Sequence, residues 1–124
     1  MARTARFAPP QHIGPYLDDV LSGLAAEEHL RGRPFRPFVE RLAHYLAEVN
    51  AVHPFREGNG RAQRAFFGQL ARDAGWRIAW ERMDPEENVA ASVASMRAEE
   101  GPLVAMLTRL VQPETVWPPF GLGD

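Results

Sequence analysis

A segment that cannot be helical separates two stretches with a clear helical period, and this arrangement constrains the fold most. Before the segment, apolar residues recur at helical spacing, at Phe38, Leu42, Tyr45, Leu46 and Val49. After it, the pattern resumes at Phe66, Phe67, Leu70 and Ala74. Residues 53–60 contain one proline and two glycines, which interrupt a helix. The sequence therefore predicts one helix running to about Val52, a turn, and a second helix from about Gly60.

Other parts of the chain also have a helical period. It is present in residues 15–30, 84–99 and 103–111. Residues 76–80 alternate apolar and polar side chains, which predicts a short extended piece. Two adjacent prolines argue against a helix in residues 7–13, where we expect an extended flap over the helices. The sequence predicts a mostly α-helical domain of about five helices with a short extended or β flap near the N-terminus.

The composition sets the class of protein. The chain has 124 residues and an even composition, which predicts one domain. A net charge of -2 gives no reason to expect direct nucleic-acid binding. The absence of cysteine excludes disulfides and thiolate metal sites. Because we find neither a membrane-spanning apolar run nor the apolar region of a signal peptide, we expect a soluble, cytoplasmic protein without membrane contact; secretion into a host cell by another route stays compatible with this.

The turn between the two central helices carries the residues of an anion site. Gly58, Asn59 and Gly60 lead into a helix start, where free backbone N–H groups and the positive end of the helix dipole attract an anion. Arg61 and Arg64 are three residues apart and share one face of the first turns. Two guanidinium groups beside such a site suit a di- or triphosphate better than a single carboxylate.

Two further side chains in the turn indicate group transfer. Glu57 would repel a phosphate unless a cation lay between them, and Mg²⁺ is the natural choice because it binds carboxylate and phosphate oxygens. His53 has an imidazole that can accept a proton from an attacking hydroxyl near neutral pH. A base, a metal ligand, an anion nest and a charge clamp together predict a phosphoryl- or nucleotidyl-transfer site.

The residues from His53 to Arg64 match every specified position of H-P-F-x-[D/E]-G-N-G-R-x-x-R, the signature of the Fic family. The chain resembles this family over roughly residues 5–111, and most closely its bacterial toxin and secreted-effector branch, where the signature reads HPFREGNGR. The resemblance implies a compact Fic-type helical bundle. We expect a Fic domain over residues 1–112 that is short on its N-terminal side, and a proline- and glycine-rich tail over residues 113–124.

The resemblance implies a protein adenylyltransferase, which moves AMP from ATP to a Tyr, Ser or Thr hydroxyl of a target protein and releases pyrophosphate. His53 would be the general base, and Glu57 would hold Mg²⁺. The other implied roles are a turn and a core anchor at Pro54 and Phe55, an anion hole at Gly58, Asn59 and Gly60, and contacts to the β- and γ-phosphates at Arg61 and Arg64. The implied target-binding flap comprises Phe7, Ala8, Pro9, Pro10 and Ile13.

The same resemblance suggests partners and leaves alternatives open. Implied targets are type II topoisomerase subunits or a small GTPase of a host. Many relatives carry an inhibitory [S/T]-x-x-x-E-[G/N] helix. In the Ser95–Gly101 stretch of this chain the spacing from Ser95 to Glu99 fits, but Glu100 stands where Gly or Asn is expected. We interpret the stretch as the polar end of a helix and expect any inhibition from a small antitoxin or from upstream sequence. The alternatives are transfer of UMP, phosphocholine or a terminal phosphate, and a catalytically silent nucleotide-binding module.

Several conspicuous residues have no supporting constellation. We interpret His12, His29 and His44 as structural or surface residues. Trp76 and Trp80 are interpreted as core or rim residues, with bordering of an adenine pocket as the lesser alternative.

Overall fold

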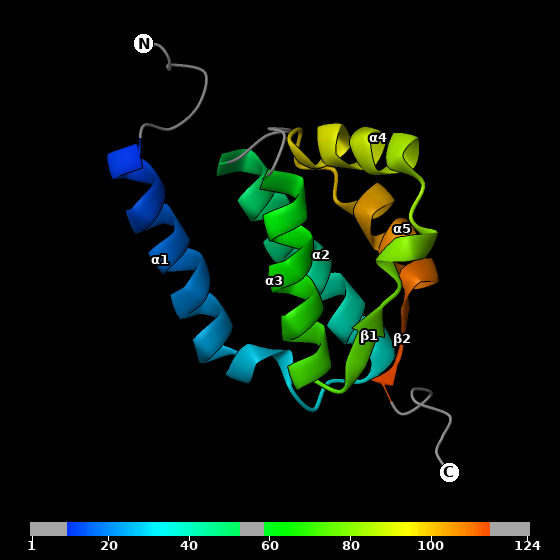
Figure 1. Cartoon of the computed structure of the whole chain (residues 1–124). Helices are drawn as coiled ribbons and strands as arrows, with labels where there is room; N and C mark the ends of the chain where they lie inside the picture. Colours follow the sequence, from blue (N-terminus) through cyan, green and yellow to red (C-terminus); the bar gives the residue numbers. More distant parts are fainter. Residues whose placement is uncertain (1–9, 53–58, 115–124) are drawn as a thin grey trace.

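The computed structural model describes residues 10–52 and 59–114, with side chains for residues 18–51 and 60–114. In these residues it contains five α-helices, two short strands and two 3-10 turns (Figure 1). Their bounds are α1 Pro10–Ala26, a turn Glu28–Leu30, α2 Phe35–Val52, α3 Asn59–Asp73, β1 Trp76–Ile78, a turn Trp80–Arg82, α4 Pro85–Ser95, α5 Gly101–Leu110 and β2 Val111–Pro113. The predicted mostly helical domain of about five helices is confirmed.

The N-terminal region differs from the prediction. Helix α1 begins at Pro10, so Pro10 and Ile13 are helical, and the expected extended flap is wrong for both residues. A proline is compatible with the first turn of a helix because the N–H it lacks would have no partner within the helix. The remaining flap residues, Phe7, Ala8 and Pro9, lie outside the described part of the chain.

The boundary between α1 and α2 also differs from the prediction. Helix α1 ends at Ala26, and the 3-10 turn that follows has backbone φ angles of 57° at Glu28, 54° at His29 and 63° at Leu30. These left-handed conformations end the helix four residues before the predicted limit. Leu30 is fully buried although the backbone there is not α-helical.

Two short strands connect the ends of α3 and α5. Trp76 lies opposite Pro113 and Ile78 lies opposite Val111 in an antiparallel pair. The extended piece predicted at residues 76–80 is therefore confirmed over residues 76–78, while Pro113, assigned to the tail, belongs to β2. Gly75 has a φ of +95° where α3 turns into β1. Helix α4 ends at Ser95, four residues before the predicted limit.

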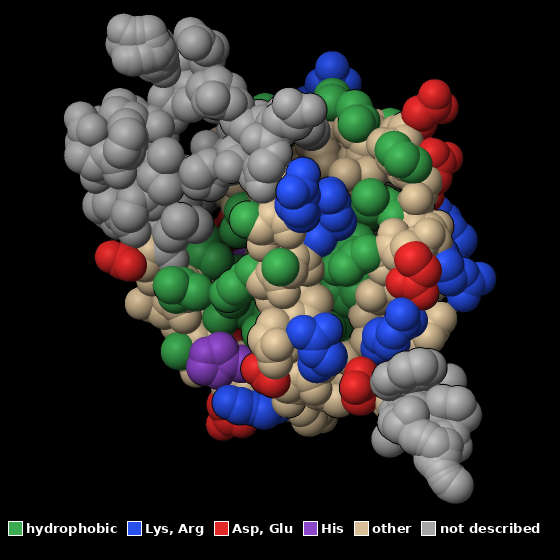
Figure 2. Space-filling model, in the orientation of Figure 1, with side chains coloured by type: hydrophobic (Ala, Val, Ile, Leu, Met, Phe, Trp, Pro, Cys, Tyr) green, Lys and Arg blue, Asp and Glu red, His purple; other side chains and the backbone are tan. Residues whose placement is uncertain are grey.

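The surface leaves some large apolar side chains exposed. Figure 2 shows hydrophobic side chains between basic groups on the face that carries α3. The exposed large apolar residues of the described part are Leu21, Phe66, Val89 and Met96. Among the helices of residues 10–52 and 59–114, none is long and apolar enough to cross a lipid bilayer.

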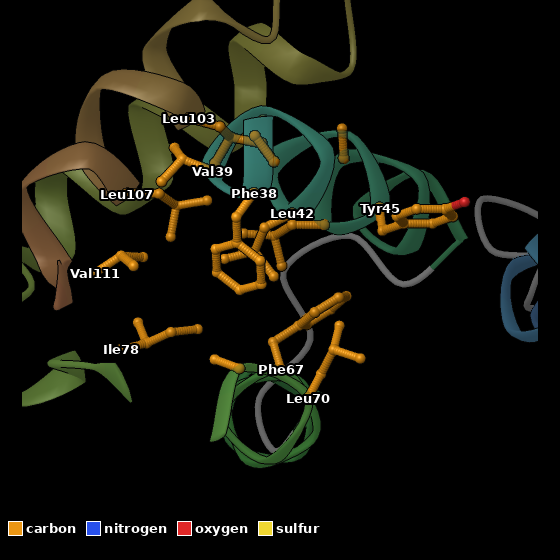
Figure 3. Packing of buried hydrophobic residues seen from close by; sticks show 14 of the residues in the cluster. Phe38, Val39, Leu42, Tyr45, Phe67, Leu70, Ile78, Leu103, Leu107 and Val111 are labelled. Atoms are coloured by element: carbon orange, nitrogen blue, oxygen red, sulfur yellow. The ribbon is translucent and has the colours of Figure 1, made fainter. Parts of the chain in front are cut away.

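Helix α2 is the centre of the core (Figure 3). Phe38 and Leu42 of α2 point toward Phe67 of α3 on one side and toward Leu107 of α5 on another. Most of the predicted core residues are confirmed as buried: Phe38, Leu42, Tyr45, Leu46, Val49, Phe67 and Leu70. The prediction is wrong for Phe66, which is exposed because it lies on the outer side of α3. Because α2 and α3 flank the signature segment, this packing holds the two helix ends between which residues 53–58 lie.

A charged cluster joins the end of α1 to α2. The Glu27 carboxylate accepts two hydrogen bonds from Arg41, at 3.0 Å from Nε and 2.6 Å from Nη2, and one from the Tyr45 hydroxyl. Arg33 Nη2 lies 3.1 Å from the same carboxylate. These partners, with Arg41 first, lower the pKa of Glu27 to about 2. Burial and the Glu27 carboxylate raise the pKa of the Tyr45 hydroxyl.

Candidate active site

The candidate site is centred on the start of α3. The end of α2, the start of α3 and the Ser95 end of α4 lie at one end of the molecule, at the top in Figure 1. Five of the predicted site residues, His53, Pro54, Phe55, Glu57 and Gly58, belong to residues 53–58, outside the described part. The structure therefore places the second half of the signature: Asn59, Gly60, Arg61 and Arg64.

The first turn of α3 is suited to an anion. Asn59 and Gly60 are its first residues, and a regular α-helix leaves the N–H groups of its first turn without partners inside the helix. The first turn contains no acidic residue that would occupy these groups or oppose the positive end of the helix dipole. The predicted helix start at about Gly60 is confirmed.

The Arg64 side chain folds back along α3 toward Gly60. A Cβ atom placed on Gly60 would lie 3.0 Å from Arg64 Nη1 and 3.8 Å from Cζ. Helical side chains point toward the N-terminus of their helix, and a residue four positions later lies above the earlier one. The guanidinium group of Arg64 and the backbone of Gly60 therefore share one end of the helix, where Arg61 is exposed as well. Figure 2 shows basic side chains gathered over this end of α3.

Trp80 supports this turn of α3 from the adjacent 3-10 turn. Its Nε1–H donates a hydrogen bond to the main-chain carbonyl of Arg64, at 3.0 Å. The indole lies beside Gly68, where a Cβ would be 3.6 Å from Nε1. The interpretation of Trp80 as a core or rim residue is confirmed by its half-buried position against the core. The sequence did not predict its hydrogen bond to Arg64. The one indication was that a half-buried indole N–H needs a hydrogen-bond acceptor.

The last turn of α2 is tied to α4 by buried polar groups. Asn50 Nδ2 lies 3.2 Å from Ser92 Oγ, and Ser95 Oγ donates to the Ser92 carbonyl at 2.7 Å. All three side chains are buried. Sequence reasoning missed this contact as well, and a polar residue on the otherwise apolar face of α2 was the only indication of it.

The Ser95–Gly101 stretch is a helix end followed by a turn. Helix α4 stops at Ser95, and Ala98 has a φ of 65°. Glu100 Oε2 lies 3.2 Å from His44 Nδ1, and His44 Nε2 lies 3.0 Å from Glu48. The interpretation of this stretch as a helix end is therefore correct only for Ser95, and residues 96–100 lie beyond the helix. His44, with these two carboxylate partners, is a structural residue as interpreted.

The described residues do not provide a metal site by themselves. Within residues 10–52 and 59–114, no group of three or more His, Asp or Glu side chains could hold a metal ion. The predicted Mg²⁺ ligand, Glu57, lies outside this part of the chain. The Mg²⁺ site stays a prediction.

Comparison with known proteins identifies the family. The sequence matches the Fic/DOC family over residues 2–71. The chain belongs to this family. The Fic/DOC match includes all of the signature, all of α2 and most of α3.

Similar Fic proteins share both sequence and fold. The chain is 40% identical over 112 residues to protein adenylyltransferase VbhT of Bartonella schoenbuchensis. It is 35% identical over 106 residues to the probable protein adenylyltransferase y4lH of Sinorhizobium fredii. The N-terminal Fic domain of a VirB-translocated Bep effector protein from Bartonella quintana, solved with bound ADP, superposes with a TM-score of 0.79 at 29% identity.

The chain spans only part of each of these relatives. The matches cover 90%, 85% and 86% of this Fic chain, but 23% of VbhT, 55% of y4lH and 50% of the solved Bartonella quintana chain.

Proposed function

We propose that this Fic domain transfers AMP from ATP to a Tyr, Ser or Thr hydroxyl of a target protein and releases pyrophosphate. The observation that carries the proposal is the Arg64 guanidinium folded over Gly60 at the N-terminus of α3. A guanidinium group and free helix N–H groups at one point suit a polyphosphate. The names of VbhT and y4lH as adenylyltransferases, and the ADP bound to the Bartonella quintana domain, support this choice of ligand.

The proposed roles follow the order of the signature. Gly58, Asn59 and Gly60 bind the α-phosphate through main-chain N–H groups, and Asn59 also positions it with its side chain. Arg61 and Arg64 contact the β- and γ-phosphates. Pro54 shapes the turn and Phe55 anchors it. Charge stabilisation by fixed donors is the main contribution a protein makes to this kind of transfer.

The chemical step is a substitution at the α-phosphorus. The target hydroxyl oxygen forms a bond to the α-phosphorus, the bond from that phosphorus to the bridging oxygen of the β-phosphate breaks, and pyrophosphate leaves. His53 accepts the hydroxyl proton. Glu57 would hold Mg²⁺, which supplies positive charge beside the phosphates; a carboxylate next to a phosphate site fits that ion.

The target segment is proposed to bind beside the N-terminal end of the chain. Main-chain pairing with an extended segment would hold it in register. Since Pro10 and Ile13 belong to α1, this role is restricted to Phe7, Ala8 and Pro9. The proposed targets are type II topoisomerase subunits or a host GTPase, and the proposed regulator is a small antitoxin. Labelling a lysate of the source organism and identifying the modified protein tests the choice of target.

Labelled ATP tests the reaction. We expect label from the α-phosphate, and not from the γ-phosphate, to move to protein. The H53A variant should lose the transfer by about 10²- to 10⁴-fold, because the general base is gone. H29A is the matched control, since His29 is exposed and distant in sequence from the signature, and it should transfer at the wild-type rate.

Other outcomes identify the alternatives. Label from the γ-phosphate alone would indicate a kinase, and transfer only from UTP or a phosphocholine donor would indicate another moiety. Binding of ATP without transfer to any protein would indicate a silent nucleotide-binding module. Any of these results would overturn the proposed AMP transfer.

A further inference from the structure

Trp80 is held rigidly between the small sheet and α3. The residue before it, Ala79, donates its N–H to the Leu110 carbonyl at the end of α5, at 2.8 Å. The Trp80 indole then donates to the Arg64 carbonyl at 3.0 Å. These two adjacent residues therefore connect the end of α5 and the second turn of α3 through one hydrogen bond each.

The contact between the Trp80 indole and α3 depends on the absence of a large side chain at Gly68. The regular helix pattern pairs the Arg64 carbonyl with the Gly68 N–H, so the indole adds a second donor to that oxygen. Gly68 is buried, and a Cβ there would lie 3.6 Å from Nε1 and 4.0 Å from Cδ1 of Trp80. A methyl group would make ordinary contact, whereas a larger side chain would occupy the space of the indole.

We propose that Trp80 is a positioning residue for Arg64: its indole holds the main chain of Arg64 so that the guanidinium stays over Gly60. The proposal rests on the proposed function only in taking a nucleotide polyphosphate as the ligand of Arg64. Holding the Arg64 main chain fixes the point from which its flexible side chain extends toward Gly60, which reduces the ordering that binding requires.

A positioning role and a purely structural role of Trp80 predict different effects on the binding of ATP and AMP. Arg64 is proposed to contact the β- and γ-phosphates, which AMP lacks. Loss of a positioning contact should therefore weaken ATP binding and leave AMP binding nearly unchanged. Loss of a structural contact alone would affect both nucleotides or neither.

Calorimetric titration with ATP and AMP tests this difference. W80F keeps an aromatic ring but removes the N–H donor. We expect it to raise the Kd for ATP about three- to tenfold, the range of one hydrogen bond, and the Kd for AMP less than about twofold. W76F is the matched control: Trp76 packs on Phe35 and Phe38, with ring centroids 5.5 and 5.8 Å apart, and its loss should change neither Kd by more than about twofold.

A double-mutant cycle shows whether the effect passes through Arg64. In an R64A background, W80F should cause no further loss of ATP affinity, because the group it positions is absent. Equal losses for ATP and AMP, or the same loss with and without Arg64, would overturn the proposal.

Two measurements do not depend on nucleotide binding. The NMR signal of the Arg64 Nε–Hε group should shift in W80F and stay in place in W76F. In G68A this Arg64 signal should stay at its wild-type position, and in G68L it should shift as in W80F, since only the larger side chain displaces the indole. If ATP fails to bind the wild-type protein, the proposed function is wrong, and an unchanged Arg64 signal in W80F and G68L overturns the positioning role separately.

Discussion

Asn50 Nδ2 donates a hydrogen bond to Ser92 Oγ over 3.2 Å, and both side chains are buried. The contact joins the last turn of α2, three residues before His53, to the last turn of α4. A buried polar group without a partner costs more than a hydrogen bond contributes, so each of these residues depends on the other. The contact therefore holds α4 against the end of α2.

This dependence predicts non-additive losses of stability. N50A and S92A should each lower the free energy of unfolding by about 1–3 kcal/mol, because each leaves a buried group unpaired. The double variant N50A/S92A should lose at least about 0.5 kcal/mol less than the sum of the two, as expected for residues in direct contact. Urea unfolding measures all three values. Strictly additive losses would show that the two side chains do not depend on each other.

The lowered pKa of Glu27 predicts that the folded protein loses stability in acid. Its folded-state pKa of about 2 lies below the ordinary value of 4.5, so its contribution is present in full above pH 4.5 and is lost as the pH falls toward 2. This difference corresponds to at most about 3 kcal/mol, and solvent around the 40% exposed Arg41 side chain reduces it to about 1–2 kcal/mol. E27Q should lose that amount at pH 7 and only about a quarter of it at pH 2.5, close to the folded-state pKa, as measured by chemical unfolding across this range.

An exposed ion pair provides the control for Glu27. Arg36 and Glu40 lie 3.0 Å apart on α2, with side chains 61% and 53% exposed. E40Q should change the unfolding free energy by less than about 0.5 kcal/mol at any pH in the range. If E27Q and E40Q follow the same pH curve, the Glu27 cluster is not the source of the acid sensitivity.

Variants of two adjacent phenylalanines of α3 should differ in stability, because one side chain packs in the core and the other lies at the surface. Phe67 is 1% exposed and Phe66 is 41% exposed, although their rings touch edge to face with centroids 5.1 Å apart. F67A should cost about 3–5 kcal/mol because it opens a cavity between α2 and α3. F66A should cost about 1 kcal/mol or less, mainly through the lost ring contact. Thermal unfolding compares the two variants, and equal costs would contradict the observed packing of α3.

Backbone conformation distinguishes two glycines that both have open space around them. A Cβ at Gly75 or Gly101 would meet no atom within 4 Å, but only Gly75 has a positive φ, of +95°. G75A should therefore cost roughly 1–2 kcal/mol through backbone strain. G101A should be neutral or slightly stabilising, because alanine restricts the unfolded chain. Denaturant unfolding of both variants checks the difference, which would be absent if residue 75 could adopt a negative φ at no cost.

Variants of two arginines of α3 distinguish a specific phosphate contact from a general effect of positive charge on ATP binding. R64A should raise the Kd for ATP about 10- to 100-fold, the range of a charge-assisted hydrogen bond. R72A, two turns further along the helix, removes an exposed guanidinium that bonds to Gln69 and should change the Kd less than about twofold. Calorimetric titration measures both, and similar effects of R64A and R72A would indicate that only the overall charge matters.

The sequence alone determined most of the helices and the start of the candidate site. The apolar period of α2 and α3 predicted both helices and, apart from the exposed Phe66, their buried faces, because the period of a helix is a local property. The position of Gly60 and the spacing of Arg61 and Arg64 likewise follow from neighbouring residues. The ends of α1 and α4 were predicted less well, since Pro10 is compatible with a helix start as well as with an extended chain.

Only the tertiary structure decided which distant residues support this site. Trp80 meets Arg64 because the strand pair β1–β2 brings the following turn against α3. Asn50 meets Ser92, and His44 meets Glu100, across more than forty residues of sequence. A local pattern indicates that a side chain faces inward, whereas its partner depends on how separate helices pack around α2.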